Sequence, residues 1–197
     1  MVRGQYRGYR AERDVAPDSE TETYCAARLR IDSWRWAGVP FCIRAGKRLA
    51  VTETEVFGNL QRPPQSVFDD VARDEPNYLR FRVNPKPELA VGARVKEPGE
   101  RMLGRGTELL VTSDFSESMM PYERLLGDAL AGDPTLFASE GEVEAQWRVV
   151  DAVLKEPPAL HFYDPGTMGP PESDRLVADV GGWRQPTVLP QSMRRVA

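Results

Sequence analysis

The sequence predicts an α+β fold in which a large, mainly antiparallel sheet has helices packed on one face. Two observations lead to this class. Between residues 24 and 115, short runs that are apolar or alternate between apolar and polar residues are separated by turn residues. After Pro121 the apolar spacing changes to that of a helix. A chain that forms strands first and helices afterwards is typical of the α+β class.

Six runs are expected to form the strands. In the first run, Cys25, Ala27 and Leu29 alternate with a second set of residues that includes two arginines, as in a strand buried on one face. No helical crossover separates the runs, so neighbouring strands are expected to pair antiparallel. The expected strands cover residues 24–31, 39–43, 53–60, 78–83, 89–95 and 107–115.

Two helices and one short helical segment are expected after the strands. The first helix follows Pro121 and is ended by the Gly-Asp-Pro sequence at residues 132–134. Ser139 and Glu142 form a capping box at the start of the second helix. The apolar stripe of that helix is expected to be buried. The stripe consists of Val143, Trp147, Val150 and Leu154. The short segment is expected around residues 172–180.

A length of 197 residues suits one domain, and we expect short segments at its two ends. The glycines and arginines at the start favour an extended N-terminal segment over residues 1–20. The domain itself is expected to cover residues 21–186. The tail, residues 187–197, is expected to be flexible.

Composition narrows the classes of function. The chain has 26 Lys and Arg against 30 Asp and Glu, a net charge of −4, so no nucleic acid or membrane partner is expected. Cys25 and Cys42, with no signal peptide before them, predict a reducing, cytoplasmic location, and both are expected to be inert buried thiols. The single histidine, His161, excludes a metal site built from several histidines. We expect it to be a structural or surface residue rather than a catalyst.

Familiar nucleotide-binding and hydrolytic motifs are absent from the sequence. No G-x-G-x-x-G follows a strand, and Gly46-Lys47 is not a P-loop because Phe41 occupies the position of its first glycine. No Cys/His spacing fits zinc, and no serine lies in a G-x-S-x-G turn. These residues therefore predict neither a catalytic residue nor a metal site.

One segment carries residues suited to an anion. Arg44, Lys47 and Arg48 cluster around Gly46, directly after the apolar run at 39–43. Glycine allows a ligand to approach the backbone closely, and a lysine ammonium is a flexible point charge that suits a phosphate. A turn with solvated basic side chains is the alternative interpretation, and composition alone favours it.

Several blocks, in order along the chain, resemble the C-terminal domain of glucose-6-phosphate dehydrogenase. The first is Arg-Gly-Gln-Tyr at residues 3–6, and the most specific are Trp-Arg-Trp-x-Gly-Val-Pro-Phe at 34–41 and Arg-x-Gly-Lys at 44–47. The other matching blocks lie at residues 21–23, 122–137, 142–147 and 163–170. Because the blocks run from residue 3 to about residue 186, the resemblance covers almost the whole chain.

The resemblance implies a function. Enzymes of this family oxidise glucose 6-phosphate to 6-phosphogluconolactone with NADP, as the first step of the oxidative pentose phosphate pathway. Their C-terminal domain supplies part of the substrate site and a homodimer interface through its sheet. On this resemblance Lys47 contacts the substrate. Thr52 takes the place of a second basic residue and offers only a hydroxyl. Arg44 is a loop-shaping residue or a weak anion contact.

The resemblance also implies what this chain does not supply. The family's histidine base and glycine-rich coenzyme turn belong to its N-terminal Rossmann part, and His161 lies in a different block. Hydride transfer needs both a bound nicotinamide and a positioned base. We therefore expect the chain alone to bind NADP weakly or not at all and to be inactive, and a separate Rossmann domain is a candidate partner. A stand-alone sugar-phosphate-binding or assembly module without catalysis is the alternative.

Overall fold

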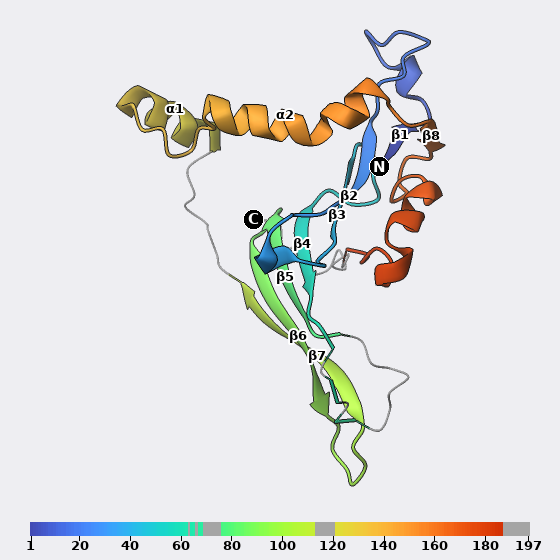
Figure 1. Ribbon diagram of the computed structural model, residues 1–197, viewed down its shortest axis with the longest axis vertical. Coiled ribbons are helices and arrows are strands. Elements are labelled where there is room, and N and C mark those ends of the chain that lie inside the picture. The colour runs from blue at the N-terminus through green and yellow to red at the C-terminus, as the bar shows by residue number, and fades with distance from the viewer. Residues whose placement is uncertain (63, 66, 69–75, 113–120, 187–197) are drawn as a thin grey trace, which may run out of the picture. The chain divides into compact units, whose positions relative to one another are not determined.

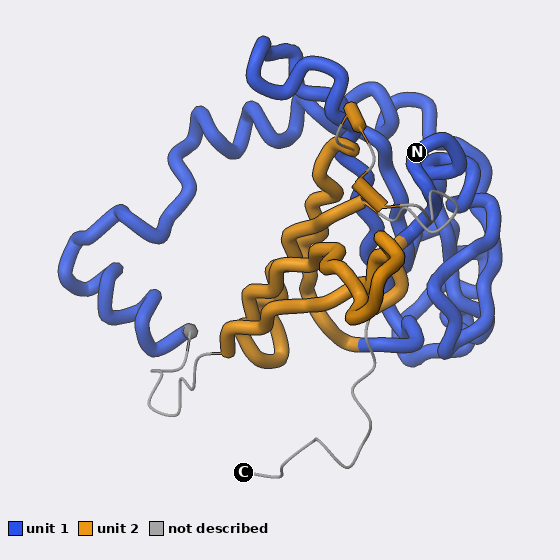
Figure 2. The backbone as a smooth tube through the Cα atoms, turned by 90° about the horizontal axis from the view of Figure 1, so that it is seen from below, with its two compact units in different colours: residues 1–51, 116–183 blue, residues 52–115, 184–197 orange. Residues whose placement is uncertain are grey.

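The computed structural model describes residues 1–62, 64–65, 67–68, 76–112 and 121–186. The chain divides into two compact units (Figure 2), and each unit is built around a sheet of four strands. The first unit comprises residues 1–51 and 116–183, and the second comprises residues 52–115 and 184–197. The expected tail at 187–197 and part of the last expected strand lie outside the described residues.

The sheet of the first unit has the order β3-β2-β1-β8 (Figure 1). The strands are β1 (Val2–Tyr6), β2 (Tyr24–Leu29), β3 (Phe41–Gly46) and β8 (Leu160–Tyr163). Neighbours pair antiparallel except β1 and β8, which are parallel with Gly4 opposite His161. The extended N-terminal segment thus supplies an inner strand, and β8 is a strand that the sequence patterns did not indicate.

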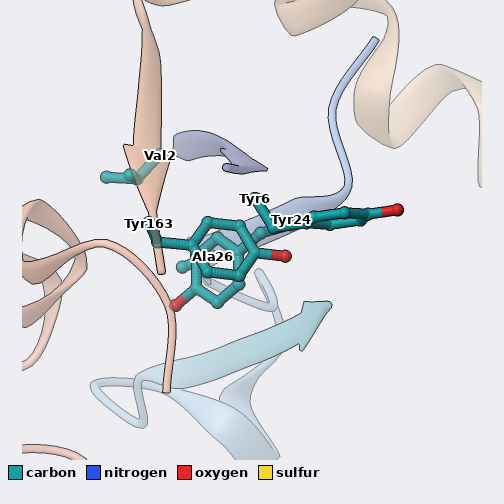
Figure 3. Packing of buried hydrophobic residues seen from close by; sticks show 5 residues of the cluster. All are labelled: Val2, Tyr6, Tyr24, Ala26 and Tyr163. Atoms are coloured by element: carbon teal, nitrogen blue, oxygen red, sulfur yellow. The ribbon is translucent and has the colours of Figure 1, made fainter. Parts of the chain in front are cut away.

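Tyrosines form the core of this unit (Figure 3). The rings of Tyr24 and Tyr163 lie with their centroids 5.5 Å apart, and those of Tyr6 and Tyr163 lie 6.4 Å apart. Gly169 has a φ of +102°, and a Cβ there would lie 2.2 Å from the Tyr24 ring. The turn after β8 therefore needs a glycine to lie against this cluster.

The sheet of the second unit is an antiparallel meander in the order β4-β5-β6-β7. Its strands are β4 (Thr54–Asn59), β5 (Tyr78–Asn84), β6 (Glu88–Lys96) and β7 (Gly104–Thr112). Each of the runs expected from the alternating pattern overlaps one of these strands or a strand of the first sheet. The α+β class with mainly antiparallel pairing is therefore confirmed, although the strands form two four-stranded sheets and not one large sheet.

One face of the second sheet holds a buried ionic network. The side chains of Arg80 and Arg82 are only 6% and 5% exposed. Arg80 donates hydrogen bonds to Glu108 (2.6 Å) and Glu88 (3.3 Å), and Arg82 donates one to Glu88 at 2.8 Å. Because a buried charge needs partners, this network ties β5 to its neighbour β6 and, across β6, to β7.

The opposite face of the second sheet is apolar and exposed. Its large side chains are between 37% and 68% exposed. They are Val56, Phe81, Val83, Leu89, Val91, Val95, Leu109 and Val111. Cross-strand register places Val56 opposite Phe81, and Leu109 opposite Val91, so these residues form one continuous surface. We call this surface the apolar sheet face.

The described part of the chain contains two α-helices, α1 (Pro121–Ala131) and α2 (Glu140–Lys155). The expected burial of α2 is wrong, because none of its residues is buried and Trp147 is 55% exposed. The apolar stripe exists, but within the described residues no sheet covers it. The short helix expected at 172–180 is instead two 3₁₀ helices, Pro171–Leu176 and Ala178–Val180. Within the described residues, no helix is long and apolar enough to cross a membrane.

The capping box that the sequence indicates is present at the start of α2. Ser139 Oγ accepts a hydrogen bond from the Glu142 amide, and the Glu142 carboxylate accepts one from the Ser139 amide at 2.7 Å. Replacing Ser139 with alanine is expected to destabilise α2 by about 1 kcal/mol. Amide hydrogen exchange in the first turn of α2 measures this. Ser33→Ala is the control, because Ser33 precedes a 3₁₀ helix without a side-chain cap and should leave exchange unchanged.

Candidate functional site

An open depression lies where β3 ends in the first unit. Its volume is about 460 Å³. It is lined by Tyr9, Glu22, Thr23, Tyr24, Cys25, Ala45, Gly46 and Lys47. Gly46 lies opposite Tyr24 in the sheet, and a Cβ at Gly46 would come within 2.8 Å of the Tyr24 ring. A glycine therefore allows the end of β3 to lie against this ring, and Lys47 follows at the rim.

Lys47 is exposed, and its ammonium has no ion-pair or hydrogen-bond partner among the residues that the structure describes. Its backbone, in contrast, is fully bound. The Lys47 amide donates to the Thr23 carbonyl at 2.8 Å, and the Tyr163 hydroxyl donates to the Lys47 carbonyl at 2.7 Å. The backbone of Lys47 is therefore fixed, while its ammonium is available to an anionic ligand.

Arg48, the next residue, is held in the left-handed region of the backbone with a φ of +55°. Its guanidinium pairs with Glu12 at 3.1 Å and lies over the Tyr6 ring, 5.7 Å from the centroid. The Tyr6 hydroxyl donates to Glu12 as well, and this hydrogen bond and Arg48 together lower the pKa of the Glu12 carboxyl. Arg48 is thus engaged by the protein itself, whereas Lys47 is not.

The other two residues expected at the site do not line this depression. Arg44 is half-buried, and its guanidinium lies 4.9 Å from the centre of the Trp183 ring. Burial lowers the pKa of Arg44. Thr52 is exposed and is the first residue of the second unit. Of the three residues, only Lys47 has a free charged group at the depression.

The first unit contains two other side chains capable of chemistry, His161 and Cys25. His161 Nδ1 is 3.2 Å from Glu172 Oε1, which agrees with a structural role for the histidine. Cys25 lines the depression as a half-buried free thiol, and burial raises its pKa, so the reactive thiolate is disfavoured. Among the described residues, no three His, Cys, Asp or Glu side chains gather as metal ligands.

The described residues contain no dinucleotide site of the Rossmann type. Such coenzymes bind where a glycine-rich turn joins a parallel strand to a helix. Here the sheets are mainly antiparallel, and the one parallel pair is β1 with β8. The α-helices of the described residues, α1 and α2, do not follow a strand through a turn of this kind.

Comparison with known proteins decides the family. The sequence profile described as "Glucose-6-phosphate dehydrogenase, C-terminal domain" matches residues 1–184. The chain belongs to this family. It is 43% identical over 188 residues to glucose-6-phosphate 1-dehydrogenase 1 of Mycobacterium bovis, an alignment that covers 94% of this chain and 40% of that protein. Glucose-6-phosphate 1-dehydrogenase of Aggregatibacter actinomycetemcomitans is 38% identical over 210 residues.

Solved structures of glucose-6-phosphate dehydrogenases have the same fold. The crystal structure of glucose-6-phosphate 1-dehydrogenase from Mycobacterium avium superposes with a TM-score of 0.84 at 40% identity, over 96% of this chain and 40% of that one. A glucose-6-phosphate dehydrogenase solved in complex with its substrate glucose 6-phosphate gives 0.78 at 28% identity, over 94% and 41%. The chain therefore spans about two fifths of the length of the relatives it matches.

Sequence reasoning proposed Lys47 as a site residue but missed the residues that hold its backbone. Tyr163 lies in a block that the resemblance includes, yet 116 residues separate its hydroxyl from the carbonyl that it binds. Glu12 and Gly166 also act on this loop from distant segments. No spacing rule connects such segments, so only the folded chain reveals these partners.

Proposed function

We propose that this chain forms the substrate-contacting and dimer-forming part of an NADP-dependent glucose-6-phosphate 1-dehydrogenase. The observation that carries the proposal is the unpaired Lys47 ammonium at the rim of the open depression. The relative solved with glucose 6-phosphate supports this choice of ligand. Lys47 would attract the substrate's anionic phosphate, whereas Thr52, which does not line the depression, offers only a neutral hydroxyl.

The proposal gives Arg44 a structural role. Its guanidinium lies over Trp183 in a half-buried position, and Arg44 does not line the depression. Desolvation also disfavours its charged form. We therefore propose that Arg44 shapes the end of β3, which precedes the Lys47 loop.

The redox step is assigned outside the described residues. Hydride transfer requires a nicotinamide and a base near the reacting hydroxyl; the described residues contain no Rossmann-type unit, and His161 is paired with Glu172. We propose that the NADP used in this reaction is bound by a separate domain, such as a Rossmann domain. The chain alone would then bind substrate without oxidising it.

The proposed dimer uses the apolar sheet face of the second unit. Eight large apolar side chains there are at least 37% exposed, which is more than an isolated soluble sheet normally shows. A second copy of the chain would cover this face with an identical one, as two-fold symmetric interfaces do.

Replacing Lys47 with alanine is expected to weaken binding of glucose 6-phosphate by at least about tenfold. Two opposite charges about 4 Å apart attract each other by about 1 kcal/mol in water and by about 4 kcal/mol near a protein surface. A loss of about 1.4 kcal/mol corresponds to a tenfold loss of affinity. Isothermal titration calorimetry of the chain measures the affinity. Lys86→Ala is the matched control, because Lys86 is an exposed lysine of the second unit. Equal affinities for Lys47→Ala and wild type would contradict the assignment.

A further inference from the structure

We propose that Tyr163 is a positioning residue that holds the Lys47 loop in its ligand-binding geometry. The inference rests on the proposed role of Lys47 and adds a second residue to it. Tyr163 ends β8, is only 3% exposed, and its hydroxyl donates a hydrogen bond to the Lys47 carbonyl in the loop. Tyr163 would not touch the substrate; it would affect substrate affinity only by fixing the position of Lys47.

The hydroxyl proton of Tyr163 can serve one strong acceptor at a time. The Lys47 carbonyl is the nearer acceptor at 2.7 Å, and the Thr23 carbonyl lies at 3.2 Å. The Thr23 hydroxyl is also 3.2 Å from the Tyr163 oxygen, so it can donate to that oxygen while the proton of Tyr163 goes to Lys47. The Thr23 carbonyl in turn accepts the Lys47 amide, which closes a ring of hydrogen bonds around the Lys47 peptide groups.

The Tyr163 ring is itself fixed. It packs between the rings of Tyr24 and Tyr6 at interplanar angles of 58° and 73° (Figure 3). A phenol has only two side-chain torsions, and a ring held on two sides leaves its hydroxyl little freedom of position. The hydroxyl is therefore a rigid anchor for the loop.

The backbone after Lys47 shows why an anchor is needed. Arg48 adopts the left-handed conformation that non-glycine residues rarely keep unless their surroundings impose it. Its carbonyl accepts from the Gly166 amide at 2.8 Å, and the Ala50 amide donates to the Thr167 carbonyl at 2.9 Å. Tyr163 and the turn after β8 thus bind the loop at Lys47, Arg48 and Ala50, and Tyr163 holds Lys47 itself.

The test compares Tyr163→Phe with Tyr78→Phe in the chain. Tyr78 is the matched control, because its hydroxyl also donates a short hydrogen bond, 2.6 Å to Glu108, but does so in the second unit. We expect Tyr163→Phe to weaken glucose 6-phosphate binding about fivefold or more and Tyr78→Phe to leave it unchanged. In a Lys47→Ala background, Tyr163→Phe should have no further effect on affinity, because it acts only through Lys47.

Amide hydrogen exchange gives a readout that does not depend on substrate. Exchange at Lys47 and Ala50 is expected to accelerate in Tyr163→Phe more than exchange in the rest of the first sheet. If Tyr163→Phe does not fold, Thr23→Val takes its place, since it removes the hydroxyl paired with Tyr163 and should loosen the same amides.

The outcomes separate the two proposals. Wild-type chain that does not bind glucose 6-phosphate would overturn the proposed function, and the exchange readout would still decide whether Tyr163 locks the loop. If the wild-type chain binds glucose 6-phosphate, Lys47→Ala binds it more weakly and Tyr163→Phe binds it equally well, only the positioning role of Tyr163 is overturned. A loss in Tyr163→Phe that persists unchanged in the Lys47→Ala background would equally overturn it.

Discussion

Replacement of Arg80 by methionine is expected to lower the free energy of unfolding by about 3–5 kcal/mol. The Arg80 side chain is 6% exposed and lies within 3.4 Å of carboxylate oxygens of Glu55, Glu88 and Glu108. Burial alone would lower the pKa of Arg80, but hydrogen bonds and charges from these glutamates raise it above the ordinary value. Without the guanidinium, buried negative charges are left facing one another, which is the costly case.

Urea unfolding followed by circular dichroism measures this effect. Methionine keeps an apolar stem of similar length, so the comparison isolates the charge. Arg105→Met is the control, since Arg105 is an exposed residue of the same sheet, and it should change stability by less than about 0.5 kcal/mol. A loss of less than about 1 kcal/mol for Arg80→Met would mean that the network does not stabilise the sheet.

Replacement of Leu109 by lysine is expected to weaken self-association of the chain at least about 100-fold, or about 2.8 kcal/mol. Leu109 is 68% exposed on the apolar sheet face, so the substitution should leave the fold of one protomer intact. In a symmetric dimer each change occurs twice, and both new ammonium groups would be buried without a partner.

Sedimentation velocity over a range of protein concentrations measures the association. Leu130→Lys is the matched control, because Leu130 is a 91% exposed leucine of α1, which belongs to the first unit and not to the apolar sheet face. The Leu130→Lys variant should self-associate as the wild-type chain does. A wild-type chain that remains monomeric at every concentration would contradict the proposed dimer, as would equal association of Leu109→Lys and wild type.

The alternating pattern predicted most strands because it is a local property. Residues such as Leu79 and Phe81 show the period of two whatever the rest of the chain does. Strand β8 has only four residues, too few for a period, and its partner β1 lies more than 150 residues away. Its pairing depends on contacts that no local rule contains.

The helix α2 shows the other limit of a sequence pattern. The stripe containing Val143 and Trp147 has helical spacing, and the capping box at Ser139 marks the start of the helix within one residue. The pattern identifies which face is apolar but does not identify what covers it. Trp147 is exposed in this chain, although its spacing is that of a buried residue.

The candidate site was predictable in part. Gly46 and Lys47 attract attention in the sequence because a small residue and a flexible cation follow a strand. The state of Arg44 was not predictable, because only the fold brings Trp183 against its guanidinium. A basic cluster in a sequence therefore does not separate the cation that is free from those that the protein already uses.

The central claim is that Lys47 and the loop around it bind glucose 6-phosphate. Titration of the isotope-labelled chain with this ligand, followed by amide chemical shifts in NMR spectra, tests it most directly. We expect saturable shifts at Lys47 and at Thr23, its backbone partner, and weaker ones with glucose, which lacks the phosphate. Shifts confined to the second unit, or none at millimolar ligand, would contradict the claim.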